Sequence, residues 1–287
     1  MKLLKELMAL TKIRVVLLST FSGITGFVVA AADISLQVIV FAVPLFMLAS
    51  GSAALNQYQE HWSDRLMDRT KHRPIPAGQL KPKISLIISA VLIMGGLLML
   101  IFNFGLIPAG LGFGAVVFYN GMYTYLKRVT AFAAVPGALV GALPPAVGWT
   151  AAGGAVDSPT LLGLMFFFYL WQIPHFWLFM GIHANDYKKA GFPSLGDTFT
   201  SCQLARITFT WIFATACAGM LFPLFGMFNH TISFVFLLGL TIWLGLDTLP
   251  LLKKQLTVVP VFRRAFVHIN IFALLIMVIL IIDHGII

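Results

Sequence analysis

The sequence predicts an all-α membrane protein whose chain crosses the bilayer nine times. Three observations support this prediction: the composition, the length of the apolar runs, and the distribution of positive charge between those runs. Of the 287 residues, 59% are hydrophobic and only 10% are charged, and the mean hydropathy is +0.93. Soluble domains carry about 25% charged residues, so this composition excludes an ordinary soluble globular protein.

Nine apolar runs follow one another along the chain, and each is long enough to cross a bilayer as a helix of about 20 residues. In order, the predicted spans are residues 13–31, 35–55, 84–103, 105–124, 131–152, 160–181, 207–226, 231–250 and 265–282. The fourth and fifth are rich in Gly and Pro, which membrane helices tolerate where neighbouring helices satisfy the freed backbone groups. The first run is too long for the apolar core of a cleavable signal, so it counts as a span.

Positive charge is confined to alternate connections. All 19 Lys and Arg lie at the start of the first span or in connections on the same side, after spans two, four, six and eight. The other side carries Asp33, Asp157 and Asp283 and no basic residue. The positive-inside rule therefore predicts a cytoplasmic amino terminus and an outside carboxyl terminus. The same bias explains the net charge of +9, so no nucleic-acid partner is predicted.

A polar segment, residues 56–78, follows the second span. Its acidic and amide side chains recur every four residues, at Asn56, Glu60, Asp64 and Asp68. Its arginines repeat at the same spacing, at Arg65, Arg69 and Arg73. Like charges four residues apart on a helix repel by roughly 0.2–0.5 kcal/mol per pair, so stability does not explain the pattern, whereas a divalent cation with a phosphate-bearing ligand does. The alternative is a solvated amphipathic helix with ion pairs.

A second polar segment, residues 171–193, follows the sixth span on the same side of the membrane. It contains Asp186 beside Lys188 and Lys189, and His175 at the edge of the span. Two such segments can hold one diphosphate through Mg²⁺ and basic side chains, as the ionisation of an allylic diphosphate requires. Two alternatives stay open: Asp186 as a surface ion pair, and His175 as a hydrogen-bonded structural residue.

Four segments resemble the UbiA superfamily of intramembrane prenyltransferases, and more closely its protoheme IX farnesyltransferase branch. Residues 56–78 resemble the first aspartate-rich motif of the superfamily. The other segments are Tyr123-Thr-Tyr-Leu-Lys127-Arg128, residues 137–149, and Trp171-Gln-Ile-Pro-His175-Phe176 followed by Asp186-Tyr187. They stand in order over the amino-terminal two-thirds of the chain, and the second and fourth are specific to the haem branch.

The resemblance implies one α-helical domain over residues 1–287, with the spans around a central cavity. It implies transfer of a farnesyl group from farnesyl diphosphate to a vinyl group of protohaem IX, with Mg²⁺ as the ion and water completing the side chain of haem O. It also implies a bacterial plasma (inner) membrane location, contact with membrane lipid and a cytoplasm-facing active site. Haem A synthase and terminal-oxidase assembly are the candidate partners.

The residue patterns and the resemblance together predict a set of site residues. The predicted catalytic and metal-binding residues are Asn56, Glu60, Asp64 and Asp186. The predicted substrate-binding residues are Arg65, Asp68, Arg69, Lys71, Arg73, Tyr123, Lys127, Arg128, Trp171, His175, Tyr187, Lys188 and Lys189. The family usually has Asp where this chain has Glu60, and often a further Asp where it has Trp62, which bears on the metal geometry.

Two other functions remain open. One is a UbiA-type enzyme that uses a quinone precursor as the prenyl acceptor. The other is a non-catalytic membrane haem carrier, although the clustering of ionisable residues on one side argues against a path across the membrane.

Overall fold

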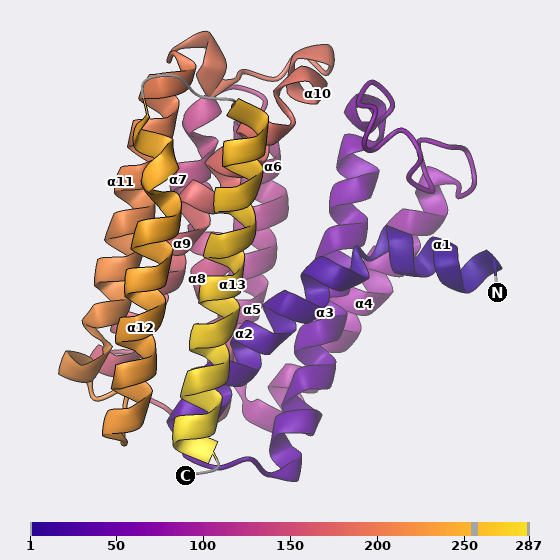
Figure 1. Ribbon diagram of the computed structural model, residues 1–287. Coiled ribbons are helices and arrows are strands. Elements are labelled where there is room, and N and C mark those ends of the chain that lie inside the picture. The colour runs from indigo at the N-terminus through magenta and orange to yellow at the C-terminus, as the bar shows by residue number, and fades with distance from the viewer. Residues whose placement is uncertain (1, 254–257, 286–287) are drawn as a thin grey trace.

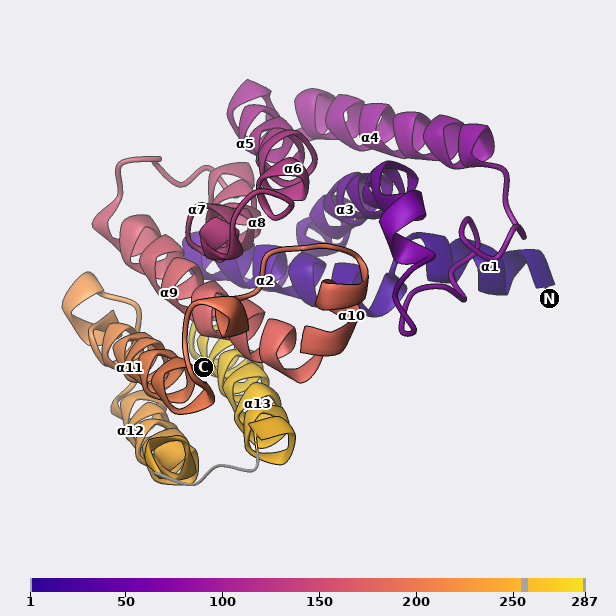
Figure 2. The same ribbon diagram turned by 90° about the horizontal axis from the view of Figure 1, so that it is seen from above.

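The computed structural model describes residues 2–253 and 258–285, and every regular element within these ranges is a helix (Figure 1). The long helices run roughly side by side as a bundle, and short helical turns connect them. Seen from above, α11, α12 and α13 lie together on one side, and α3 and α4 lie on the other (Figure 2). The predicted all-α fold class is confirmed.

The helical elements follow one another along the chain in three groups. The first part contains α1 (Lys2–Leu10), α2 (Ile13–Ala31), α3 (Leu36–Asp64), α4 (Pro82–Phe104), α5 (Leu106–Val116), the π-helix η1 (Val117–Tyr123) and α6 (Thr124–Leu126). The middle part contains η2 (Ala131–Ala133), α7 (Ala134–Gly137), α8 (Leu139–Ala151), α9 (Pro159–Ile182), α10 (Ala184–Lys189) and η3 (Leu195–Asp197). The last part contains α11 (Ser201–Met220), η4 (Phe222–Phe225), α12 (Thr231–Thr248), η5 (Leu249–Leu252) and α13 (Val258–Gly285).

Eight helical stretches among the described residues are long and apolar enough to cross a membrane, and each overlaps a predicted span. The protein is therefore an integral membrane protein. The remaining predicted span, at 207–226, falls on α11 and η4. The 20 residues of α11 pack against α9 and α12, but Gln203 and Arg206 lower the mean hydropathy of its first turns. The count of nine spans and the direction of the termini stay predictions.

Glycines bring α2 and α8 into backbone contact at the centre of the bundle. A Cβ atom at Gly148 would lie 1.9 Å from the carbonyl oxygen of Gly23, and one at Gly26 would lie 2.0 Å from that of Pro145. Small residues allow membrane helices to approach this closely. The Gly- and Pro-rich composition of the fifth predicted span thus serves packing against α2, which also contacts α3 and α13.

A cluster of charged side chains joins α12 to α13. Asp247 is paired with both Arg264 and His268. Ionisable residues within membrane spans are usually paired with one another or functional, and this mutual pairing accounts for Asp247 and His268 without a ligand.

Three local features of the backbone bear on the polar segment at the end of α3. The 29-residue helix α3 continues to Asp64, so its last turns carry the polar segment. The π-helix η1 interrupts the span that begins with α5, and π-helical turns are rare and frequent at functional sites. Lys12 has the left-handed backbone angle φ of 52° and separates α1 from α2.

Candidate active site

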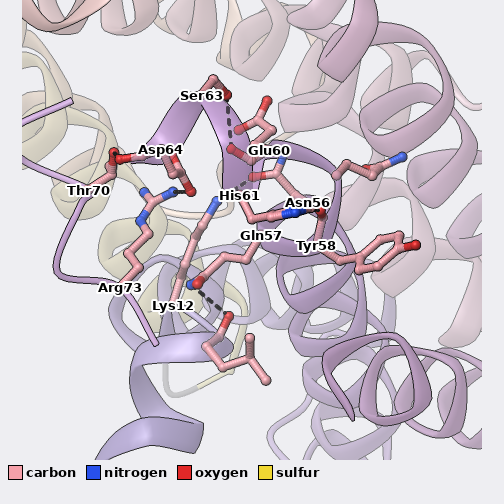
Figure 3. Close-up of polar contacts among 12 residues, drawn as sticks. Lys12, Asn56, Gln57, Tyr58, Glu60, His61, Ser63, Asp64, Thr70 and Arg73 are labelled. Carbon is pink, nitrogen blue, oxygen red and sulfur yellow. Dashed lines mark hydrogen bonds and ion pairs between the residues drawn. The ribbon is translucent and has the colours of Figure 1, made fainter. Parts of the chain in front are cut away.

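Asn56, Glu60 and Asp64 lie on successive turns at the end of α3 (Figure 3). All three are buried, with exposed fractions of 1%, 5% and 2%. A four-residue spacing drifts by only about 40° per step on an α-helix, so the three side chains share one side of α3. The helix ends at Asp64, and Asp68 therefore lies beyond it in an exposed turn. Three of the four residues predicted to share this face therefore do so, and Asp68 does not.

Each of these three side chains contacts a cationic side chain from a different part of the chain. Lys12 Nζ donates to Asn56 Oδ1 at 2.6 Å, Arg73 Nη1 donates to Asp64 Oδ2 at 2.7 Å, and Lys127 forms an ion pair with Glu60. Leaving a buried carboxylate without a partner is costly, so these contacts explain how the acidic side chains can be buried. They also concentrate three basic side chains at one place.

Lys12 is a member of the candidate site that the sequence did not predict. It comes directly before the first span, and its Nζ atom also lies 3.5 Å from the hydroxyl of Tyr119. Burial, followed by the positive charges of Arg73 and Lys127, lowers the pKa of Lys12 to about 7, although the charge of Glu60 acts in the opposite direction. The signal that could have revealed it is a lysine at the break between two helical patterns.

The donor chemistry at the end of α3 fits Mg²⁺. Magnesium is commonly bound by one or two carboxylates together with substrate phosphates and water, and here two carboxylates and an amide oxygen are buried on one side of a helix. Among the described residues, no three His, Cys, Asp or Glu side chains converge on one point. An ion held by Glu60 and Asp64 would therefore depend on Asn56 and on the phosphate oxygens of a substrate.

Asp186 joins the two polar segments. Its carboxylate accepts hydrogen bonds from the backbone N–H of Asp68 at 2.9 Å and of Arg69 at 3.3 Å. Asp186 is buried and belongs to the short helix α10. The predicted meeting of the two segments thus occurs, and the contact is from carboxylate to backbone. This contact fixes the start of the turn that leads to Arg73.

A second link between the segments lies at the surface. Asp68 pairs with Lys189 from α10 and with Lys71 at 2.7 Å. Hydrogen bonding to Lys189 and then to Lys71 lowers the pKa of Asp68 to about 2. Because these three side chains are about half exposed, each pair contributes little to stability.

The other predicted basic residues are divided between the site and the surface. The Arg69 guanidinium lies 4.9 Å from the centre of the Phe179 ring, and burial lowers the pKa of Arg69. Arg128 donates to the backbone oxygen of Gln59, in the last turns of α3, at 2.8 Å. Arg65 lies over the exposed Trp62 ring, 4.7 Å from its centre, and Lys188 is exposed.

A row of aromatic rings leads from Lys12 towards His175. Tyr119 stacks on Tyr123 with ring centres 6.1 Å apart, and Tyr123 stacks on Phe176 with ring centres 5.0 Å apart. The ammonium group of Lys127 lies 5.5 Å from the centre of the Tyr123 ring. This row connects the charged side chains at the end of α3 to Phe176 on α9.

Two further predicted residues lie near this row. Tyr187 is on α10, and burial raises its pKa to about 12. Trp171 is on α9, and its Nε1–H donates to the backbone oxygen of Ile269 on α13 at 3.1 Å. Its ring centre lies 4.8 Å from that of His175.

Polar residues inside the spans hold α3 in place, and the sequence analysis missed them. Asn120 on η1 donates to the backbone oxygen of Ser52 at 3.0 Å and to the side chain of Gln59 at 3.1 Å. Gln57 Nε2 donates to the backbone oxygens of Ala9 at 2.7 Å and Leu10 at 3.0 Å. Polar residues at membrane depth are usually functional or paired, and this rule was the available signal.

Sequence comparison gives one family match and many relatives. The profile of the UbiA prenyltransferase family matches residues 16–257. A protoheme IX farnesyltransferase from Geobacter sulfurreducens is 40% identical over 223 residues, which cover 75% of this chain and 79% of the relative. A protoheme IX farnesyltransferase from Nitratidesulfovibrio vulgaris is 34% identical over 272 residues, covering 94% and 92%.

Structural comparison finds the same fold in solved structures. A digeranylgeranylglyceryl phosphate synthase superposes with a TM-score of 0.75 at 17% identity, covering 99% of each chain. A UbiA homologue from Archaeoglobus fulgidus, bound to DMAPP and Mg²⁺, superposes with a TM-score of 0.60 at 16% identity, covering 95% of this chain and 99% of that one. At these identities the likeness concerns the fold.

Proposed function

The chain belongs to the UbiA prenyltransferase family, and from this premise we propose that it transfers a farnesyl group from farnesyl diphosphate to a vinyl group of protohaem IX, giving haem O. Relatives that carry the name protoheme IX farnesyltransferase support this choice of substrates. The observation that carries the proposal is the continuous arrangement of buried oxygen donors, cations and aromatic rings from the end of α3 to α9.

We assign diphosphate binding to the side chains at the end of α3. Asn56, Glu60 and Asp64 would hold Mg²⁺, which supplies positive charge to the diphosphate when it is bound. Lys12, Arg73 and Lys127 already lie against these three side chains and are within reach of phosphate oxygens. As the carbon–oxygen bond breaks, the leaving diphosphate takes the electron pair, and fixed positive groups stabilise its growing charge.

We assign binding of the farnesyl carbons to the row of aromatic rings. Loss of diphosphate leaves an allylic cation, and the π faces of Tyr119, Tyr123 and Phe176 stabilise positive charge. The vinyl group then donates its electron pair to the farnesyl carbon. The cation formed beside the porphyrin accepts water, which loses a proton and leaves the hydroxyl of the new side chain. His175, next to Phe176, lies at the acceptor end of this path.

We place the enzyme in the bacterial inner membrane with this site facing the cytoplasm. Support comes from the connections after α3, α6 and α9, which carry basic residues and lie at the end of the bundle with α10, whereas the end of α13 lies at the opposite end (Figure 1). Haem O made there would be available to haem A synthase or to terminal-oxidase assembly.

A product-mass assay tests the proposed function. Purified protein in lipid nanodiscs receives farnesyl diphosphate and Mg²⁺ with either protohaem or 4-hydroxybenzoate. Farnesylated haem, absent when EDTA is added, is the expected product. Farnesylated 4-hydroxybenzoate alone would assign the quinone-precursor alternative, and haem binding without any product would assign the carrier alternative.

A further inference from the structure

His175 and Asn270 form a polar contact between α9 and α13. His175 Nδ1 lies 2.9 Å from Asn270 Oδ1, although the two residues are 95 positions apart in the sequence. One turn earlier on α9, Trp171 donates to the backbone oxygen of Ile269. Two neighbouring residues of α13 therefore receive hydrogen bonds from side chains one turn apart on α9.

The amide orientation of Asn270 is determined by a second contact. Asn270 Nδ2 donates to the backbone oxygen of Phe266, which can only accept a hydrogen bond. Turning the amide over would place two acceptors against each other, so Oδ1 is the atom that faces His175. An amide oxygen is also only an acceptor, and Nδ1 of His175 must therefore carry the proton.

This assignment leaves Nε2 as the other functional atom of the neutral ring. In neutral imidazole, one nitrogen donates and the other accepts. The structure gives Nε2 no hydrogen-bond partner among the described residues. The ring is half-buried, and its centre lies 4.8 Å from that of Trp171 and 5.0 Å from that of Phe266. The imidazole thus packs against two tilted aromatic rings and is hydrogen-bonded through Nδ1, with the Nε2 lone pair left for a ligand.

We propose that Asn270 is a positioning residue that fixes His175 in the Nδ1–H form, and that Nε2 of His175 coordinates the iron of a metalloporphyrin acceptor. This inference rests on the proposed function, because it assigns the acceptor end of the same site. Metal-binding histidines usually donate their second ring N–H to an oxygen acceptor, and loss of that acceptor typically costs 10–100-fold in metal affinity. Asn270 supplies such an acceptor from another helix.

Haem titration and resonance Raman spectroscopy of the full chain test this proposal. In the reduced haem complex, the iron–histidine stretching band should be present in wild type and absent in His175→Ala. Asn270→Leu should weaken haem binding at least tenfold and shift this band to lower frequency, because the imidazole loses its acceptor. Asn270→Asp keeps an acceptor oxygen and should retain the band at equal or higher frequency.

Asn103→Leu is the matched control. Asn103 Nδ2 donates to the backbone oxygen of Met99 at 2.8 Å, four residues earlier as in Asn270, but Asn103 is exposed on α4 and contacts no histidine. Its substitution should change neither haem affinity nor the band. Equal behaviour of Asn270→Leu and Asn103→Leu would overturn the proposal, as would an iron–histidine band that survives in His175→Ala.

The ring tautomer can be read without any substrate. Nitrogen NMR of ¹⁵N-histidine-labelled protein, with His175→Ala to assign the signals, should show a protonated Nδ1 and an unprotonated Nε2. A proton on Nε2 would overturn the inference even if the variants fold poorly. Failure of the proposed function is distinguishable, because it appears as missing farnesylated haem in wild type.

Discussion

The Asp186 carboxylate accepts a hydrogen bond from the backbone N–H of Asp68 at 2.9 Å, and this bond joins segments that are 118 residues apart in the sequence. With the bond from Arg69, it ties α10 to the turn that leads from Asp64 to Arg73. The position of Arg73 against Asp64 therefore depends on a residue from the second polar segment.

We expect Asp186→Ala to raise the KM for farnesyl diphosphate about tenfold. A hydrogen bond to a charged group contributes about 1.5–3 kcal/mol, and a loss of about 1.4 kcal/mol is tenfold in affinity. Steady-state kinetics measure the change. Asp197→Ala is the control, because the Asp197 carboxylate accepts the backbone N–H of Ser194 at 2.9 Å in an exposed turn. Equal effects of the two substitutions would refute the joining role of Asp186.

Asp64→Asn should lower Mg²⁺-dependent turnover on the order of 100-fold while the protein stays folded. The substitution removes a charge that would hold the ion and leaves Arg73 without its anionic partner, and loss of a single electrostatic contact at a reacting charge commonly has this size. Initial rates against Mg²⁺ concentration measure the effect, with thermal unfolding as the check on folding. Undiminished turnover would remove Asp64 from the site.

Stability should rise as the pH increases from about 7 to 10.5, through Lys12. The pKa of Lys12 is about 7 in the folded protein against 10.5 for an ordinary lysine. Between these values the unfolded chain binds more protons than the folded chain, so the free energy of unfolding increases with pH. Lys12→Met should flatten this part of a thermal unfolding profile. Lys83→Met, at an exposed position on α4, is the control, and an unchanged slope in Lys12→Met would contradict the expectation.

Phe176→Leu should lower kcat about tenfold and change KM less. The substitution keeps an apolar side chain but removes the ring that stacks on Tyr123, and a π face near a cation contributes about 0.5–2 kcal/mol. Phe102→Leu provides the comparison, because Phe102 is 82% exposed on α4. Rate constants for haem farnesylation distinguish the two, and a pure KM effect would argue against a role in the reaction.

Gly148→Ala should destabilise the bundle by about 1–3 kcal/mol, the usual cost of forcing extra atoms into a packed interior. The added Cβ would meet the carbonyl oxygen of Gly23, a backbone atom that cannot move alone. Gly114→Ala on α5 is matched, because its Cβ would meet nothing within 4 Å. Thermal unfolding in detergent should show a lower midpoint for Gly148→Ala alone.

The sequence predicted the helical spans and the shared side of Asn56, Glu60 and Asp64, because both follow from local periodicity. It did not predict that α3 ends at Asp64, so it placed Asp68 on the same face. Lys12 and Asn270 were missed because their roles depend on contacts with residues 44 and 95 positions away. A local sequence pattern does not show which distant helix supplies the partner of a side chain.

The predicted span at residues 207–226 begins six residues after the start of α11 at Ser201. Gln203 and Arg206 make its first turns less apolar than the rest of the bundle, and Gln203 instead caps the helix with Thr200. Hydropathy alone therefore underestimates the length of a helix whose first turn is stabilised by capping hydrogen bonds.

The hydrogen bonds from Gln57 to Ala9 and Leu10 have a practical consequence for handling the protein. They attach α1 to the turn of α3 between Asn56 and Glu60. A change in the position of α1 is therefore expected to displace the side chains of Asn56 and Glu60. Affinity tags and fluorescent fusions placed there will report on a perturbed enzyme. The end of α13 lies far from α10 (Figure 1), so we expect attachment beyond it to leave the proposed catalytic end of the bundle undisturbed.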